Sequence, residues 1–268
     1  MAGSIHPTAI IDSGCQLGKD VTIGPYVIIE SNTILGDGTR VDPFAQIKNF
    51  TSLGKNNHIY SYSCLGEAPQ DIKYQGQETW LKIGDNNKIR EYATLNRGTP
   101  EGDGVTYIGS HCFLMAYTHV AHDCRLENGV IMANGATLGG HVHLGQKVVI
   151  GGLSAVHQFV HIGEFSFIGG KSGVAQDVPP YLLAAGERVK TYGPNIIGMR
   201  RAGFDRQQIK AVKKAFQILW DSGLSRQEAV SRAREQFAGF ETVEKMISFI
   251  ESSKRGIISR EKQQESDG

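Results

Sequence analysis

Large apolar residues recur at every sixth position along the first two thirds of the chain. The series runs from Ile5 to Leu65, from Ile83 to Leu95 and from Ile108 to Val174. Four positions after almost every member comes a small or β-branched residue, with Asn57 and Asn87 as exceptions. A period of six fits neither the ~3.6 residues per turn of an α-helix nor the two-residue alternation of one long strand. It favours short strands separated by tight corners, and so predicts a parallel β-helix.

Three such hexads would close one triangular coil, so residues eighteen apart in the sequence should stack in neighbouring coils. Each strand would pair with the coils on either side, about 4.8 Å away. The apolar and small positions would then point inward. This interpretation makes Cys15, Cys112 and Cys124 apolar fillers of the core rather than reactive thiols.

Two insertions interrupt the hexads, near residues 71–82 and 101–107. We expect both to be external loops on a β-helical domain that spans residues 1–190. Loops that break a regular solenoid commonly carry binding functions.

The repeat stops at Pro179–Pro180, and helical patterns follow. Residues 191–268 are therefore predicted to form a C-terminal helical domain that covers the open edge of the solenoid. One further helix is expected at roughly 242–254. Two capping-box sequences open the preceding helices: Asp205 with Gln208, and Ser225 with Glu228.

Composition narrows the possible functions. The 33 glycines among 268 residues are about twice the usual share, as frequent tight corners require. The 28 basic residues nearly cancel the 27 acidic ones, so no global field favours nucleic acid or an anionic membrane. No apolar stretch approaches the ~20 residues of a membrane span, and the first residues lack a signal-peptide pattern. We therefore expect a cytoplasmic protein.

The histidines are clustered, and none of the nine falls on an inward position. Seven lie within three consecutive coils: His111, His119, His122, His141, His143, His157 and His161. By the eighteen-residue rule, His122 lies beneath Gly140 and Gly140 beneath Gln158, while Asp123 lies beneath His141. An imidazole base, a carboxylate to orient it and an unshielded backbone N–H are the groups that acyl transfer requires.

Three other interpretations compete with acyl transfer. Surface histidines on a solenoid can simply be solvated. His119 and His122 could be two zinc ligands completed by a neighbouring chain, as in hexapeptide-repeat carbonic anhydrases, although Asp123 and Gly140 would then have no role. A non-enzymatic β-helix could bind a partner through its flat faces, but the long loops and irregular outer residues argue against this.

Several motifs resemble those of the UDP-N-acetylglucosamine acyltransferases, in both the solenoid and the tail. They are PQDIKYQG from Pro69, THVAHDC from Thr118, LGGHVHLG from Leu138, AVHQF from Ala155 and VAQDVPPY from Val174. The resemblance implies a left-handed parallel β-helix and a homotrimer with active sites in clefts between subunits. The hexads themselves do not determine the handedness, and the general preference of strand crossovers is right-handed.

The resemblance also implies a reaction and roles within it. An (R)-3-hydroxyacyl group would move from acyl carrier protein to the 3-hydroxyl of UDP-N-acetylglucosamine, the first step of lipid A synthesis. His122 would be the general base, Asp123 its orienting partner and Gly140 the oxyanion donor. No cofactor and no metal are expected, because the thioester donor is already activated.

The same resemblance implies substrate contacts. Gly170 would sit at the position associated with acyl-chain length, and its missing side chain suggests room for a longer chain. The implied contacts to the sugar, the nucleotide and the rest of the cleft are Asp71, Lys73, His119, His141, His157, Gln158, Asn195 and Arg201.

The sequence departs from the family pattern at Asn96, Ile197 and Ala202. These departures leave open whether the acceptor carries a 3-hydroxyl or a 3-amino group. The related UDP-acylglucosamine N-acyltransferase is the nearest alternative enzyme.

Overall fold

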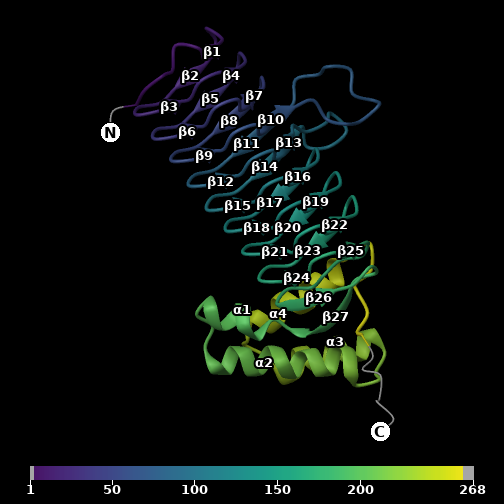
Figure 1. The fold of residues 1–268 in the computed structure, drawn as a ribbon. Coiled ribbons are helices and arrows are strands. Elements are labelled where there is room, and N and C mark those ends of the chain that lie inside the picture. The colour runs from purple at the N-terminus through teal and green to yellow at the C-terminus, as the bar shows by residue number, and fades with distance from the viewer. Residues whose placement is uncertain (1–2, 262–268) are drawn as a thin grey trace.

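The computed structural model describes residues 3–261, which form a three-sided β-helix followed by a helical segment (Figure 1). Up to Val174, each sheet takes every third strand of the chain, as three hexads per coil predict. The first sheet contains β1 (Ile10–Ile11), β4 (Ile28–Ile29), β7 (Gln46–Ile47), β10 (Cys64–Glu67), β13 (Thr94–Asn96), β16 (His119–Val120), β19 (Thr137–Leu138), β22 (Ala155–Val156) and β25 (Gly173–Val174).

The other two sheets follow the same rule. The second contains β2 (Gln16–Leu17), β5 (Ile34–Leu35), β8 (Thr51–Leu53), β11 (Trp80–Ile83), β14 (Val105–Ile108), β17 (Arg125–Leu126), β20 (His143–Leu144) and β23 (His161–Ile162). The third contains β3 (Thr22–Ile23), β6 (Arg40–Val41), β9 (His58–Ile59), β12 (Lys88–Ile89), β15 (Phe113–Leu114), β18 (Ile131–Met132), β21 (Val149–Ile150), β24 (Phe167–Ile168), β26 (Leu182–Ala185) and β27 (Lys190–Pro194).

The predicted eighteen-residue stacking is confirmed wherever the hexads run without interruption. His119 pairs with Thr137 in a parallel register, for example. Between coils, many corner residues adopt left-handed backbone angles, among them Asp123 (φ 57°) and His141 (φ 59°). L-residues seldom adopt this conformation, but the corner needs it to turn the chain between sheets.

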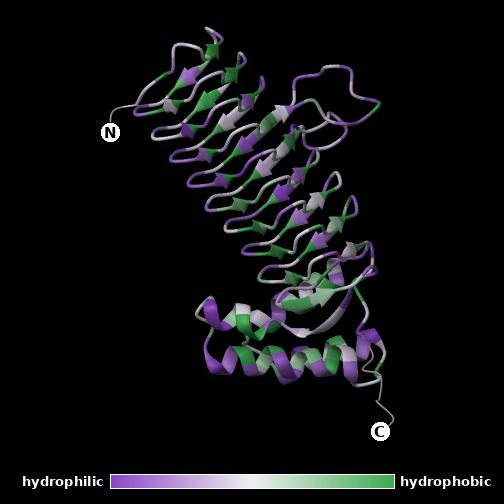
Figure 2. Ribbon diagram, viewed as in Figure 1, coloured by the Kyte–Doolittle hydropathy of each residue, from purple (hydrophilic) through white to green (hydrophobic). Residues whose placement is uncertain are grey.

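The inward positions form one continuous hydrophobic core, and hydrophobic segments recur coil after coil in Figure 2. The first coil has no neighbour above it, so Ile5 is 53% exposed. Asn57 and Asn87 are the exceptions in the small-residue series. Both are buried, and their side chains form hydrogen bonds with backbone groups of the same and neighbouring coils. The Asn57 amide donates to the carbonyls of Gly54 and Gly84 at 3.0 and 2.8 Å, and its oxygen accepts from the Asn87 N–H at 2.9 Å.

The cysteine prediction is confirmed. Cys112 and Cys124 are buried in the core, and Cys15 packs against it half-buried. Burial raises the pKa of Cys112 to about 11 and that of Cys124 to about 12. These thiols therefore stay protonated and unreactive at neutral pH.

The two insertions begin and end earlier than the sequence pattern suggested. They occupy residues 68–79 and 97–104, because β11 and β14 are four-residue strands that take up the last positions of each predicted loop. In β14, alternate residues are buried, and its four residues pair with β11 in unbroken register. The longer insertion projects from the side of the solenoid next to β10 (Figure 1).

The helical segment lies across the last coils of the solenoid (Figure 1). Both capping boxes are present, at Asp205 and at Ser225. Asp205 begins the second helix and Ser225 the third. The helices are α1 (Ile196–Arg201), α2 (Arg206–Phe216), the π-helix η1 (Gln217–Asp221), α3 (Arg226–Gln236) and α4 (Glu241–Ser252).

The expected boundary between residues 190 and 191 falls inside a strand. β26 extends the third sheet in parallel with β24, and β27 then pairs antiparallel with β26. The outer backbone groups of β26 are therefore paired by β27, before the helices begin. Within residues 3–261, no helix combines the length and the apolar character needed to cross a membrane.

Candidate functional site

Both insertions and most of the predicted site residues lie on one edge of the solenoid. We call it the loop edge: the corners that connect each strand of the first sheet to the following strand of the second sheet. In the central coils it comprises residues 68–79, 97–104, 121–124, 139–142 and 157–160. Because the coils stack, side chains that are far apart in sequence meet along this edge.

His122 and Asp123 form a hydrogen-bonded pair at the centre of the loop edge. His122 Nδ1 lies 2.8 Å from Asp123 Oδ2. The Asp123 side chain is only 2% exposed, whereas that of His122 is 15% exposed. Since an ionised carboxylate can only accept, Nδ1 carries the proton and Nε2 keeps its lone pair. His122 is thus oriented to accept a proton at Nε2.

Insertion 97–104 encloses the Asp123 carboxylate. The Thr99 hydroxyl donates to Oδ2 at 2.6 Å, and the Thr99 N–H lies 3.1 Å from both oxygens. A Cβ on Gly102 would come within 2.4 Å of Oδ1, so only glycine lets the loop close over this group. Burial alone would raise the pKa of Asp123, but hydrogen bonds from His122 and Thr99 hold it below its usual range.

Gly140 lies directly against the His122 ring, in the next coil. A Cβ at this position would stand 2.6 Å from His122 Cε1 and 2.7 Å from Nε2. The glycine is therefore required by the imidazole. Among residues 3–261, the Gly140 N–H has no hydrogen-bond acceptor. It remains available to stabilise negative charge that develops beside Nε2.

Two more histidines flank this pair. The His141 ring stands edge-on to His122 with centroids 5.1 Å apart, is stacked on Phe159, and has Nε2 3.8 Å from Asp123 Oδ2. His119 Nδ1 lies 2.8 Å from Thr94 Oγ1. Burial, and the nearby His122, lower the pKa of His119. The neutral His119 can therefore bind a polar substrate without adding charge.

Asp71 and Lys73 lie in insertion 68–79, on the same edge as His122. Asp71 is half-buried and accepts a hydrogen bond from the Lys73 N–H at 2.9 Å, which shapes the turn. The Lys73 side chain is exposed. Asn96, a departure from the family pattern, is 2% exposed, and its amide donates to Ala68 O at 2.9 Å. It secures the base of the loop.

His157 and Gln158 occupy the next position of the loop edge, beyond Gly140 and His141. The Gly140 carbonyl accepts from the Phe159 N–H at 2.9 Å, which confirms the predicted stacking. Both side chains are exposed. Arg255, from the C-terminal segment, lies 3.3 Å from His157 Nδ1, so that segment reaches the same edge.

The remaining predicted contacts are not at the loop edge. Gly170 is exposed at a corner between the third and first sheets, above Gly152. Asn195 begins α1: its side-chain oxygen accepts from the Gly198 N–H at 3.0 Å, and its amide donates to Phe165 O at 2.9 Å. Arg201 is exposed at the end of α1. Of the departures from the family pattern, Ile197 lies within the same short helix and Ala202 is its C-cap.

One group within residues 3–261 has ligand atoms close enough to hold a metal ion: His122, Asp123 and His141, within 4.8 Å of one another. His119, which the zinc hypothesis paired with His122, is not in this group. Asp123 Oδ2 already accepts hydrogen bonds from His122 and Thr99. A metal ion would have to displace these donors, so the geometry favours a base and its orienting carboxylate.

Sequence reasoning missed the residues that hold the pair in place. Besides Thr99, the Thr106 hydroxyl accepts from the Asp123 N–H at 2.8 Å, and Thr94 contacts His119. Insertion 97–104 lengthens the spacing between coils, so that Thr94 pairs with His119, twenty-five positions away. The eighteen-residue rule therefore could not find Thr94 or Thr99, whereas Thr106, seventeen positions before Asp123, lies within its reach.

Comparison with known proteins gives consistent matches. A family profile described as UDP N-acetylglucosamine O-acyltransferase, domain 2, matches residues 177–258, and a bacterial transferase hexapeptide profile matches residues 106–140. A protein from Burkholderia ambifaria is 52% identical over 258 residues, covering 95% of this chain and 98% of that protein. One from Aliarcobacter butzleri is 49% identical over 256 residues, covering 95% and 97%. Both are named as O-acyltransferases for acyl carrier protein and UDP-N-acetylglucosamine.

A solved structure agrees with these relatives. The Acinetobacter baumannii protein titled LpxA superimposes with a TM-score of 0.92 at 42% identity, covering 95% of this chain and 99% of that one. The fold is the left-handed parallel β-helix that the motif resemblance implied.

Proposed function

The chain belongs to the family of UDP-N-acetylglucosamine O-acyltransferases that use acyl carrier protein, and we propose that it moves the acyl chain at the loop edge, with His122 as the general base. The reaction is the first step of lipid A synthesis. The observation that carries the proposed mechanism is the arrangement of His122: Nδ1 is held by Asp123, Nε2 is free, and Gly140, whose N–H has no acceptor within residues 3–261, packs against the imidazole ring.

The proposed reaction is a direct transfer. His122 Nε2 takes the proton of the sugar 3-hydroxyl as its oxygen attacks the thioester carbonyl carbon. The carbonyl oxygen becomes an oxyanion, which the Gly140 N–H stabilises. The carbon–sulfur bond then breaks, and the imidazolium returns its proton to the departing thiolate. Asp123 stabilises the transient imidazolium and keeps the ring oriented.

The acceptor would lie along the loop edge. His141 and His119 both lie near His122, and insertion 68–79 brings Asp71 and Lys73 to the same edge. We assign these residues to the sugar and its phosphates, with His157 and Gln158 on the far side of Gly140. Asn195 supports α1, and its exposed neighbour Arg201 suits a diphosphate as a bidentate donor.

We propose a homotrimer because the implied site is divided between two edges of one chain. His122 lies on the loop edge and Gly170 on a different edge, between the third and first sheets. An acyl chain could reach both only if another copy brought its Gly170 edge to this loop edge. A cleft between subunits therefore accounts for both positions.

A basic surface supports the protein donor. Arg200, Arg206, Lys210 and Lys213 line a hollow over α1 and α2, together with Phe204. None of the four cations forms an ion pair within the described residues. Such a surface attracts an acidic partner protein through complementary charge. We place the reaction in the cytoplasm, where carrier-protein thioesters are made.

Purified protein incubated with UDP-sugars and acyl carrier proteins of several chain lengths tests the assignment. Mass spectrometry should find one (R)-3-hydroxyacyl group on UDP-N-acetylglucosamine. A product formed only from a 3-amino sugar would favour the N-acyl variant that Asn96, Ile197 and Ala202 leave open. No acylated nucleotide sugar from any donor would refute the assignment.

We expect chelation to leave the activity unchanged, because Asp123 is already bound by hydrogen-bond donors and the thioester needs no Lewis acid. Rates before and after dialysis against a chelator, together with metal analysis, check this. Stoichiometric zinc whose removal abolishes activity, and whose return restores it, would establish a zinc mechanism instead.

We expect Gly170→Met to shift donor preference toward shorter acyl chains. Gly170 is exposed, and a Cβ there would lie 3.2 Å from Gly152 O, so the backbone needs only a small adjustment. A bulky side chain would block the end of the acyl groove, and each excluded methylene forfeits about 0.8 kcal/mol of burial.

Competition between carrier proteins with different acyl lengths measures that shift. Gly14→Met, at an exposed corner of the first coil, is the control for adding a methionine to the solenoid surface. Unchanged selectivity in Gly170→Met would show that the acyl chain runs elsewhere.

A further inference from the structure

Insertion 97–104 fixes the carboxylate of Asp123 from three directions. Thr99 is 1% exposed, and its hydroxyl and N–H both donate to the carboxylate. Gly98 and Gly102 lie against the same group, where an added Cβ would stand 2.9 and 2.4 Å from Oδ1. The loop leaves Asp123 almost no freedom to turn away from His122.

The same insertion also holds the other loop. Arg97 is only 7% exposed, and Nη1 donates to Gly66 O at 2.7 Å. Its Nε and Nη2 both donate to the Tyr74 hydroxyl, at 3.1 and 3.0 Å, and that hydroxyl donates to Gln77 O at 2.5 Å. Arg97 therefore joins the end of β10 to the middle of insertion 68–79.

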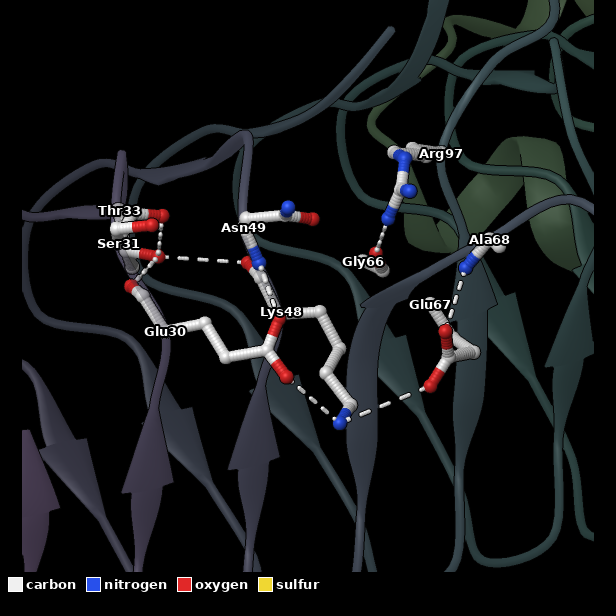
Figure 3. Close-up of polar contacts among 9 residues, drawn as sticks. All are labelled: Glu30, Ser31, Thr33, Lys48, Asn49, Gly66, Glu67, Ala68 and Arg97. Atoms are coloured by element: carbon white, nitrogen blue, oxygen red, sulfur yellow. Dashed lines mark hydrogen bonds and ion pairs between the residues drawn. The ribbon is translucent and has the colours of Figure 1, made fainter. Parts of the chain in front are cut away.

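The start of insertion 68–79 is secured from the opposite side. Figure 3 shows Lys48 between Glu30 and Glu67, with Nζ 2.9 Å from Glu30 Oε1 and 3.8 Å from Glu67 Oε2. In the same view the Glu67 carboxylate accepts from the Ala68 N–H at 2.8 Å, and Arg97 points to Gly66. The base of the loop is thus fixed, and among the side-chain hydrogen bonds within residues 3–261, those from Arg97 to Tyr74 tie its outer part to another segment.

We propose that residues 97–99 are the positioning element of this reaction. Thr99 holds in place the carboxylate that orients His122, and Arg97 holds in place the loop that carries Asp71 and Lys73. The inference rests on the proposed function. Neither Arg97 nor Thr99 touches the reacting atoms. One short stretch of chain therefore couples the geometry of the base to that of the acceptor loop.

Loss of the Thr99 contact and loss of the Arg97 contact are expected to change different kinetic constants. Thr99→Val removes the hydroxyl and keeps the shape, so kcat should fall roughly tenfold to a hundredfold with KM unchanged. Tyr74→Phe removes the acceptor for Arg97, so KM for UDP-N-acetylglucosamine should rise about tenfold with kcat retained. Thr99→Ser, which keeps a hydroxyl, should recover most of the kcat.

The pH profile provides a readout that a merely structural role would not move. The titratable groups that face Asp123 are His122 and His141. The Thr99 hydroxyl helps to hold the pKa of Asp123 below its usual range, so without it the carboxylate is protonated at a higher pH. The acid limb of the kcat profile should therefore move to higher pH in Thr99→Val.

Matched controls come from positions outside the site. Thr22→Val alters a half-buried threonine of β3, and Tyr26→Phe alters an exposed tyrosine, both in the N-terminal coils. Both should show wild-type kinetics. Equal kcat and KM changes in Thr99→Val and Tyr74→Phe, or wild-type values in both, would overturn the proposal while the wild type remains active.

Two measurements separate this proposal from the proposed function. NMR titration of the Asp123 carboxyl should show a raised pKa in Thr99→Val, because the lost hydroxyl helps to lower it, and trypsin should cleave after Lys73 faster in Tyr74→Phe than in Tyr26→Phe. Neither needs turnover. An inactive wild type with both effects present would refute the function alone, and unchanged titration and cleavage would refute the positioning roles.

Discussion

Replacing His122 with alanine is expected to remove nearly all transferase activity and leave the β-helix folded. Its Nε2 is the free basic atom of the hydrogen-bonded pair, and general-base catalysis contributes roughly 10²–10⁴-fold. The residue points outward, so its loss removes little core packing. The turnover number of purified His122→Ala, measured beside its circular dichroism and thermal unfolding, tests both statements.

A histidine at another corner provides the matched control. His111 is exposed and adopts a left-handed φ of 61°, which asparagine tolerates, so His111→Asn should be fully active. Wild-type turnover in His122→Ala would exclude the general-base role. Parallel loss of folding and activity would show that His122 is structural.

Replacing Asp123 with asparagine should cost almost as much, roughly 10²–10⁴-fold in kcat. All its partners, the Thr99 N–H, the Thr99 hydroxyl and His122 Nδ1, are donors. An amide offers one acceptor oxygen and an NH2 group that would face a donor. The imidazole would lose both its orienting acceptor and the charge that stabilises its protonated form.

Asp103→Asn is the control for this variant, because Asp103 is exposed in the same insertion. Steady-state rates of both proteins, with unfolding curves to exclude a collapse of the loop, make the comparison. Retention of more than about a tenth of wild-type kcat in Asp123→Asn would mean that the carboxylate contributes little more than a hydrogen bond.

The repeat alone places some of the site residues, and others could be placed only from the structure. His122, Gly140 and Gln158 follow one another at intervals of eighteen, so the hexads alone bring them into one column. That rule does not place Thr99 and Arg97, because they lie in an insertion whose conformation depends on its own contacts. Asn195 shows a second limit: the family resemblance implied a nucleotide contact, and only the fold shows that its side chain also caps α1 and donates to Phe165 O.

The six-residue period by itself determined the three-sided solenoid, the inward residues and the stacking of His122 under Gly140, because each of these repeats a local geometry that the spacing records. Only the tertiary structure decided the rest. It showed that Thr99 encloses Asp123, that Arg97 holds insertion 68–79 through Tyr74, and that the Asn195 side chain caps α1. Those features arise from hydrogen bonds and close contacts between non-repeating segments, which no periodic pattern encodes.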